Sequence, residues 1–219
     1  MYEITIIFAL AFLFLIVYFV GMYRNRKIAV NYARTVKEHM SKRSTFVGFR
    51  PYSRGGFRVL CKLKEKEPFT EVEMAVSLVD RENLMHYPLS LLTKDKDRLA
   101  CWGFFKNSIP FSVEILPIKD EKLCSKVAHE RGLTRVISNG EFYESFAVLA
   151  SNHELADKFL SDRRLQKRIL EMKAFIKRLS LSEKDSRLYL IGDLKEASSV
   201  RSLIDVFMYC GELCGKIQA

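Results

Sequence analysis

Residues 4–22 read ITIIFALAFLFLIVYFVGM, a run of nineteen residues without a charge, in which Thr5 is the only conventional polar side chain. A helix of this length rises about 28 Å, close to the roughly 30 Å hydrocarbon core of a bilayer. Only the charge of Glu3 precedes the run, whereas several basic residues follow it at once. The positive-inside rule then predicts a membrane anchor over residues 1–23, with the N-terminus outside and the rest of the chain in the cytoplasm.

Two other interpretations of this run stay open. A cleaved signal peptide carries its positive charge before a shorter apolar run and ends in a small-x-small site. Here the charge comes after the run, which ends in Val20, Gly21, Met22 and Tyr23. A buried core helix would need a partner that covers it on all sides. The sequence favours an uncleaved anchor.

Small residues within the span mark where another helix would approach most closely, although lipid-facing positions fit them equally well. They are Ala9, Ala11 and Gly21. Residues 24–44 then continue without proline or glycine, and Ile28, Tyr32, Val36 and Met40 recur every four residues. This pattern predicts a juxtamembrane helix with one apolar stripe. Its basic residues are candidate contacts for anionic lipid headgroups: Arg24, Arg26, Lys27, Arg34 and Lys37.

The remaining residues, 45–219, are enough for one sizeable domain. The formal net charge of the chain is +10, from 36 basic and 26 acidic residues, which favours anionic partners such as lipid headgroups, RNA or an acidic protein surface. The cysteine count is odd, and buried free thiols are expected in a reducing compartment. The five are Cys61, Cys101, Cys124, Cys210 and Cys214.

Strand-like and helix-like segments interleave in this domain. Period-two alternation predicts strands over 57–64, 72–78, 99–106, 111–118, 133–138, 141–150 and 187–191. Periodicity and capping residues predict helices over 81–92, 120–131, 152–160, 162–179 and 195–215. Residues 46–56 are expected to form a loop, and Asn139-Gly140 to join a hairpin. The fold class is α+β, with helices packed on one face of a mixed or antiparallel sheet.

The expected helix over 162–179 carries seven basic and two acidic residues. Its basic side chains are candidate contacts for ribosomal RNA or a protein partner, and a solvated helix surface is the other interpretation. They are Arg163, Arg164, Lys167, Arg168, Lys173, Lys177 and Arg178. An alternative function is therefore a membrane-tethered domain that binds RNA or anionic lipid.

Known catalytic patterns do not occur in the sequence. There is no phosphate loop, no dinucleotide-binding glycine motif and no nucleophile elbow. The four histidines stand far apart, and Asp95 and Asp97 are expected to be solvated in a turn. We therefore expect a protein without enzymatic activity, metal or cofactor.

The order of segments resembles the calumin family, also called coiled-coil domain-containing protein 47. The resemblance covers residues 4–219 and rests on pattern and order, since no catalytic motif carries it. The segments are GMYRNRKIAVNYARTVKEHMSKRSTFVGF (21–49), GGFRVLCKLK (55–64), VEMAVSLVDRENLMHYPLSLL (72–92), ESFAVLASNHELADKFL (144–160), KAFIKRLSLSEKDSRLYLIGDL (173–194) and VRSLIDVFMYCGELCGKI (200–217).

This resemblance implies a subunit of the PAT complex, an intramembrane chaperone that assists the insertion and folding of multipass membrane proteins. Implied partners are an Asterix-like small multispanning protein, the Sec translocon, the ribosome and nascent multipass clients. The membrane would be the endoplasmic reticulum in a eukaryote and the plasma membrane in an archaeon. Family members also carry an acidic lumenal segment and a basic C-terminal coiled coil. Neither is present in this sequence, so calcium binding is not carried over, and ribosome contact through such a tail is not expected.

Overall fold

The computed structural model describes residues 2–52, 55–83, 90, 92–93 and 95–218. It begins with one unbroken helix of 39 residues, α1 (Tyr2–Met40), and continues into a domain built on a nine-stranded sheet. The strands are β1 (Ser44–Tyr52), β2 (Gly56–Leu63), β3 (Phe69–Ser77), β4 (Asp97–Phe105), β5 (Val113–Pro117), β6 (Thr134–Val136), β7 (Phe146–Ala150), β8 (Ile176–Ser182) and β9 (Arg187–Leu194). The other helices are α3 (Glu121–Arg131), α4 (Glu141–Ser145), α5 (His153–Leu160), α6 (Arg163–Glu171) and α7 (Ala197–Gln218).

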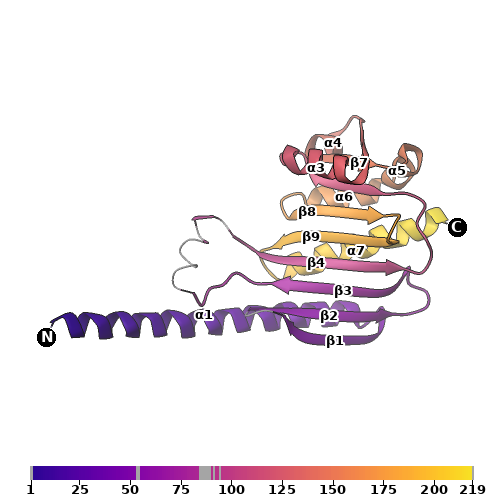
Figure 1. The fold of residues 1–219 in the computed structure, drawn as a ribbon. Helices are drawn as coiled ribbons and strands as arrows, with labels where there is room; N and C mark the ends of the chain where they lie inside the picture. The colour runs from indigo at the N-terminus through magenta and orange to yellow at the C-terminus, as the bar shows by residue number, and fades with distance from the viewer. Residues whose placement is uncertain (1, 53–54, 84–89, 91, 94, 219) are drawn as a thin grey trace.

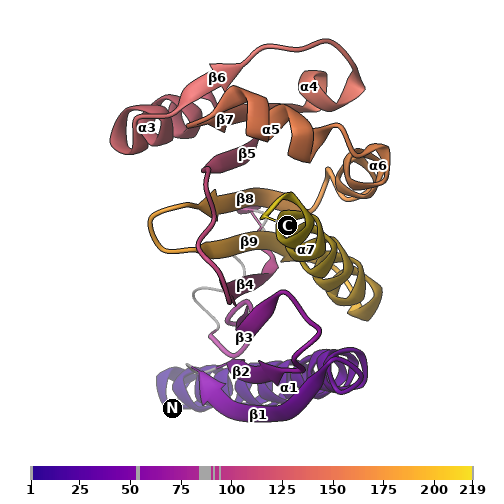
Figure 2. The ribbon, with the colours of Figure 1, turned by 90° about the vertical axis from the view of Figure 1, so that its right-hand side faces the viewer.

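The strands follow the order β1-β2-β3-β4-β9-β8-β5-β7-β6, and every pairing between neighbours is antiparallel. Most of them run along the direction of α1, so one end of the sheet faces the N-terminal half of that helix (Figure 1). Figure 2 looks along the strands and places α6 and α7 on one side of the sheet and α3 on the other. The predicted α+β class is confirmed.

The main core lies between the sheet and the helices α1, α5, α6 and α7. Alternate residues of the central strands supply it: Leu99 and Cys101 from β4 are fully buried, as are Leu188 and Leu190 from β9. Helix α7 closes this layer, and Phe207 stacks on Phe69 with ring centroids 5.3 Å apart. A smaller cluster under α3 occupies the opposite face of the sheet.

Several predicted elements are confirmed. Helix α3 ends at Gly132, which adopts the left-handed conformation at φ 62°. Asn152 caps α5 by accepting a hydrogen bond from the amide of Leu155 at 3.2 Å. The strands expected around 57–64, 72–78 and 99–106 correspond to β2, β3 and β4. The helix expected over 81–92 falls largely outside the described residues.

The loop expected over 46–56 is wrong, because Ser44–Tyr52 forms β1. Gly48 and Pro51 are residue types typical of loops, yet a strand at the edge of a sheet tolerates both. The tight turn expected at Asn139-Gly140 is also wrong, although the antiparallel pairing of the strands on either side of it is confirmed. Gly140 precedes the short helix α4, and β6 and β7 pair across it. This helical turn packs Phe142 against Phe146 in the core, with their ring centroids 5.5 Å apart.

The helix expected over 162–179 ends at Glu171, and Ile176 begins strand β8. Helical spacing continues through Met172 and Ile176, but Leu179 and Leu181 also alternate with serines, as a buried strand requires. Pairing of β8 with both β5 and β9 decides the outcome. The strands expected over 99–106 and 111–118 do not lie side by side, because β9 and β8 lie between β4 and β5.

Candidate functional site: the junction of the apolar helix and the domain

Gly21 is the first buried residue of α1 among those that the structure describes. A Cβ added there would collide with the backbone carbonyl of Arg81, in the segment that follows β3. Only glycine permits this close approach of two backbones. Gly21 was expected to face either another membrane helix or lipid, whereas in the structure it packs against the chain's own segment after β3.

One turn further on, Asn25 is buried within α1 and ties the helix to the same segment. Its Nδ2 donates to the carbonyl of Val79 at 3.1 Å, and its Oδ1 accepts from Nη1 of Arg81 at 2.9 Å. Both polar ends of the amide are therefore satisfied, as burial demands.

Arg81 in turn holds Asp97, the first residue of β4, through two hydrogen bonds of 3.0 and 3.1 Å. The Oδ1 of Asp97 also accepts from the amide of Val79 at 2.8 Å. Asp97 is 4% exposed, so the expectation that this carboxylate is solvated is wrong. We call Gly21, Asn25, Val79, Arg81 and Asp97 the helix–loop clamp. No local sequence signal reveals it, because residues far apart in the chain form it.

Tyr32 extends this polar region two turns along α1. Burial, with a further contribution from the charge of Asp97, raises the pKa of Tyr32 to about 12. Beyond it, Val36 and Met40 are fully buried in the main core. At the end of the helix His39 lies 3.0 Å from Asp205 of α7. The second half of α1 is therefore an integral part of the domain.

The first half of α1 has the opposite character. Only 6% of its most apolar 18-residue stretch is buried. Phe8, Phe12 and Phe19 are each more than half exposed. Within the described residues, α1 is the one helix long and apolar enough to cross a membrane. Ala9 and Ala11 lie on this exposed part.

Three of the candidate headgroup contacts lie next to the clamp in α1, and Arg34 and Lys37 lie further along the helix. Each of the five is exposed on α1: Arg24, Arg26, Lys27, Arg34 and Lys37. Sequence reasoning missed a second basic group at the same end of the sheet. Lys96, Arg98 and Lys177 lie 3.5, 3.8 and 3.3 Å from the buried carboxylate of Asp193. Pairing of β4 with β9 assembles this basic group, and no local sequence pattern predicts it.

The seven candidate RNA contacts do not form one helical face. Four of them lie exposed on α6: Arg163, Arg164, Lys167 and Arg168. The other three lie beyond its end. Lys173 lies 3.4 Å from Glu141, Lys177 contacts Asp193, and Arg178 points to the opposite side of the sheet.

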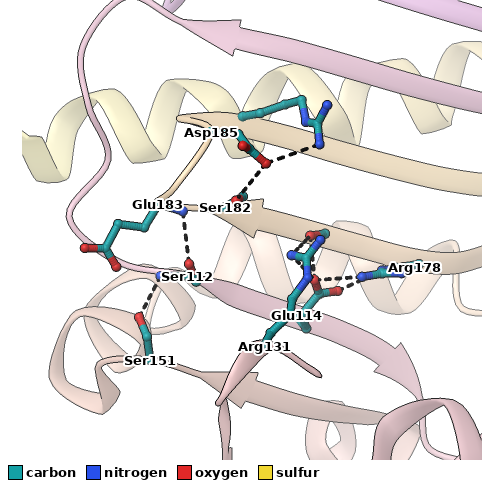
Figure 3. Close-up of polar contacts among 10 residues, drawn as sticks. Ser112, Glu114, Arg131, Ser151, Arg178, Ser182, Glu183 and Asp185 are labelled. Atoms are coloured by element: carbon teal, nitrogen blue, oxygen red, sulfur yellow. Dashed lines mark hydrogen bonds and ion pairs between the residues drawn. The ribbon is translucent and has the colours of Figure 1, made fainter. Parts of the chain in front are cut away.

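Arg178 belongs to a buried ion pair that fixes α3 on the sheet (Figure 3). Two of its nitrogens donate to Glu114, each at 2.9 Å, and Glu114 is fully buried. Arg131 from α3 lies 2.6 Å from the same carboxylate, and Ser180 donates to it at 2.6 Å. Glu114 is fully buried and its partners come from β8 and α3, so this cluster serves the architecture.

The cysteines are free, and four of the five are buried. Burial raises the pKa of Cys61 to about 12 and raises that of Cys101 further, so neither is a reactive thiolate. Among the residues that the structure describes, no group of three or more His, Cys, Asp or Glu side chains is placed to hold a metal.

Comparison with known proteins assigns no family to this chain. No protein-family model matches the chain, and no curated protein matches it. Among solved structures, the chain has a distant likeness to the crystal structure of the mycobacterial trehalose monomycolate transport factor A, TtfA. The match is 11% identical, covers 78% of this chain and 70% of that chain, and has a TM-score of 0.31. At this TM-score the likeness supports no functional conclusion.

Proposed function

We propose that this chain is a single-pass, non-enzymatic membrane scaffold that holds its folded domain at a fixed position against the cytoplasmic face of a membrane. One observation carries the proposal. Helix α1 runs without a break from an exposed apolar half into a half that is buried in the domain core. An apolar surface of that length is stable in lipid and costly in water.

The clamp gives the scaffold its rigidity. A flexible linker after a span lets a domain rotate freely, whereas Gly21 and Asn25 attach the segment that follows β3 to the helix where the apolar run ends. That segment is in turn held to the start of β4 by Asp97. The domain's orientation relative to the span is then set by the fold. Exposed arginines and lysines on α1 face the headgroup region, where each contributes about 1 kcal/mol toward an anionic surface.

The finer proposal is that the scaffold belongs to an intramembrane chaperone complex for multipass membrane proteins. The resemblance in segment order to the calumin family supports it. On this proposal the partners are a small multispanning membrane protein, the Sec translocon and, more distantly, the ribosome.

Crosslinking in native membranes, followed by affinity purification of the full chain in mild detergent, tests this proposal. We expect a translocon subunit and a small multispanning protein to be recovered with the chain. A variant whose first 20 residues are replaced by an unrelated span, with Gly21 and the rest of the clamp kept, is the matched control for contacts made within the membrane. Recovery of neither a translocon subunit, nor ribosomes, nor a small membrane partner would contradict the proposal.

A second candidate function is binding of anionic lipid or RNA, favoured by the exposed basic side chains of α6 and of the membrane-facing end. Replacing Arg164, Lys167 and Arg168 with glutamate should abolish RNA or liposome binding at moderate salt if α6 is the surface. Unchanged binding would reject that surface.

A further inference from the structure

The face of the sheet opposite α7 carries a groove between β1 and β4. Directly opposed residues form its floor, with Leu60 beside Glu73 and Glu73 beside Trp102. Phe46 of β1 is 53% exposed at its side. The groove has a volume of about 320 Å³, and Gly48 leaves the space that the Phe46 ring occupies. Groups of half-exposed aromatic and aliphatic side chains of this kind mark interaction sites.

Two arginines lie beside the groove, and an anion bound between them would reduce their mutual repulsion. Arg50 and Arg58 are directly opposed on β1 and β2, where like charges destabilise a strand pair. The guanidinium of Arg58 lies 4.2 Å from the ring of Tyr52. Its Nε is buried and has no hydrogen-bond partner among the described residues. A carboxylate that bridges the two guanidinium groups would relieve the repulsion and satisfy that nitrogen.

The groove lies close to the predicted membrane surface. At the tip of the β1–β2 hairpin, a Cβ added to Gly55 would lie 3.4 Å from Nδ2 of Asn25 in the clamp. Arg50 and Arg58 are paired near this tip, whereas Phe46 is paired with Lys62 toward the far end. The positive charges therefore lie between the membrane and the apolar part of the groove.

This order of charge and apolar surface favours a peptide over a lipid. A lipid whose phosphate sat on Arg50 and Arg58 would have to withdraw its chains from the bilayer and point them away from it. A peptide that leaves the membrane beside α1 meets the arginines first and the apolar groove next. It also finds the free edge of β1, whose backbone groups an extended strand can pair with.

A second copy of this chain cannot pair antiparallel with the β1 edge. The strands run along α1 (Figure 1), so antiparallel pairing of two β1 strands would point the two apolar helices in opposite directions. Two anchors inserted the same way in one membrane cannot adopt that arrangement.

We propose that this groove binds a membrane-proximal cytoplasmic segment of a partner membrane protein, one that combines acidic with aliphatic or aromatic residues. The inference rests on the proposed scaffold function and gives its partner a chemistry. The carboxylates bind Arg50 and Arg58, and the apolar side chains pack on Leu60, Phe46 and Trp102.

Trp102 is the single tryptophan of the chain, so its fluorescence reports on this groove alone. The experiment uses the full chain in lipid nanodiscs of neutral phosphatidylcholine. The probe is a short peptide that alternates glutamate with phenylalanine and leucine. We expect a saturable change in Trp102 emission that weakens with salt, and none with the matched peptide that carries lysine in place of glutamate.

Two variants test the groove, each with a matched control. Arg50→Glu should weaken peptide binding by about tenfold or more, whereas Arg163→Glu, the same charge change on α6, should leave it unchanged. Phe46→Asp should weaken binding likewise, and Ile137→Asp, at a residue that is 91% exposed, should not. Arg50, Phe46, Arg163 and Ile137 are all exposed, so the folded domain tolerates these changes.

The inference is wrong if the acidic peptide causes no saturable change, if the lysine peptide binds equally well, or if only dispersed phosphatidylglycerol changes Trp102 emission. Capture of partners from native membranes separates this inference from the proposed function. If Arg50→Glu captures the same partners as the wild type, the groove assignment fails and the scaffold stands. If the wild type captures none, the scaffold proposal fails, and peptide binding still decides the groove.

Discussion

At the scale of single residues, Asn25 marks the point where α1 passes from exposed apolar surface to the interior of the domain. A buried amide is costly unless every polar atom finds a partner, and Val79 and Arg81 supply those partners. Arg81 is shared between Asn25 and Asp97, so the amide, the guanidinium and the carboxylate depend on one another. Loss of one member leaves the others buried and unsatisfied.

Replacing Gly21 with valine tests the backbone contact of the clamp. The added side chain must displace the carbonyl of Arg81, so we expect a loss of about 1–3 kcal/mol in the free energy of unfolding. Thermal unfolding in detergent measures it. Ala9→Val, on the exposed part of α1, is the control and should change stability by less than about 0.5 kcal/mol. Equal stability of the two variants would rule out the contact.

Replacing Arg81 with methionine tests the ion pair. Asp97 is then left buried without its cation, and we expect a loss of about 3–5 kcal/mol in the free energy of unfolding. The double variant Arg81→Met, Asp97→Asn removes the uncompensated charge and should recover part of this loss, which chemical denaturation can measure. Additive effects of the two substitutions would show that the pair is not coupled.

Tyr32 predicts how stability changes at alkaline pH. Its pKa is raised from 10.0 to about 12, so the folded state retains the phenol proton longer than the unfolded state. The stabilisation from the neutral phenol is fully present below pH 10.0 and is lost as the pH rises to about 12. Across that pH interval the free energy of unfolding of Tyr32→Phe should fall by about 2–3 kcal/mol less than that of the wild type. Parallel pH profiles of unfolding would contradict this assignment.

At the scale of elements, local sequence patterns predicted the helices, caps and strands that depend on neighbouring residues. The apolar run, the helix that ends at Gly132, the cap at Asn152 and the alternating strands β2, β3 and β4 are all legible in sequence. Each of these depends on residues within a few positions of one another, where periodicity and capping act.

Elements whose identity depends on distant pairing were predicted wrongly. Ile176–Ser182 carries a spacing that fits a helix, and only its position between β5 and β9 makes it a strand. The same limit applies to the sites. Nothing near Asp97 in sequence indicates Asn25 as its indirect partner, and nothing near Arg178 indicates Glu114. Burial of these charges follows from topology, which a single sequence does not reveal.

The change from helix α6 to strand β8 gives a prediction at this scale, because Arg178 lies in β8. Arg178→Glu would place a second carboxylate beside fully buried Glu114, and we expect a loss of about 3–5 kcal/mol in the free energy of unfolding. Arg164→Glu on exposed α6 should change it by less than about 0.5 kcal/mol. Urea denaturation of both variants decides the matter. If the predicted single basic helix were correct, the two substitutions would have similar, small effects.

At the scale of the whole molecule, one helix joins two environments. Its first half presents phenylalanine, leucine and isoleucine outward, and its second half closes the core together with α7. The sheet stands end-on to the exposed half of α1 (Figure 1). Arg50 and Arg58, near the hairpin tip that meets Asn25, therefore lie at the end of the domain that faces the proposed membrane. An anchored domain of this form presents a fixed surface to neighbouring membrane proteins.

Intact-mass measurement of the chain purified from membranes, combined with protease treatment of sealed inside-out vesicles, tests the central claim most directly. The account predicts that the mass retains the residues of the apolar run, and that protease added to the cytoplasmic face digests the domain and leaves a fragment containing that run. A mature chain that begins beyond Tyr23, or a domain protected inside such vesicles, would contradict it.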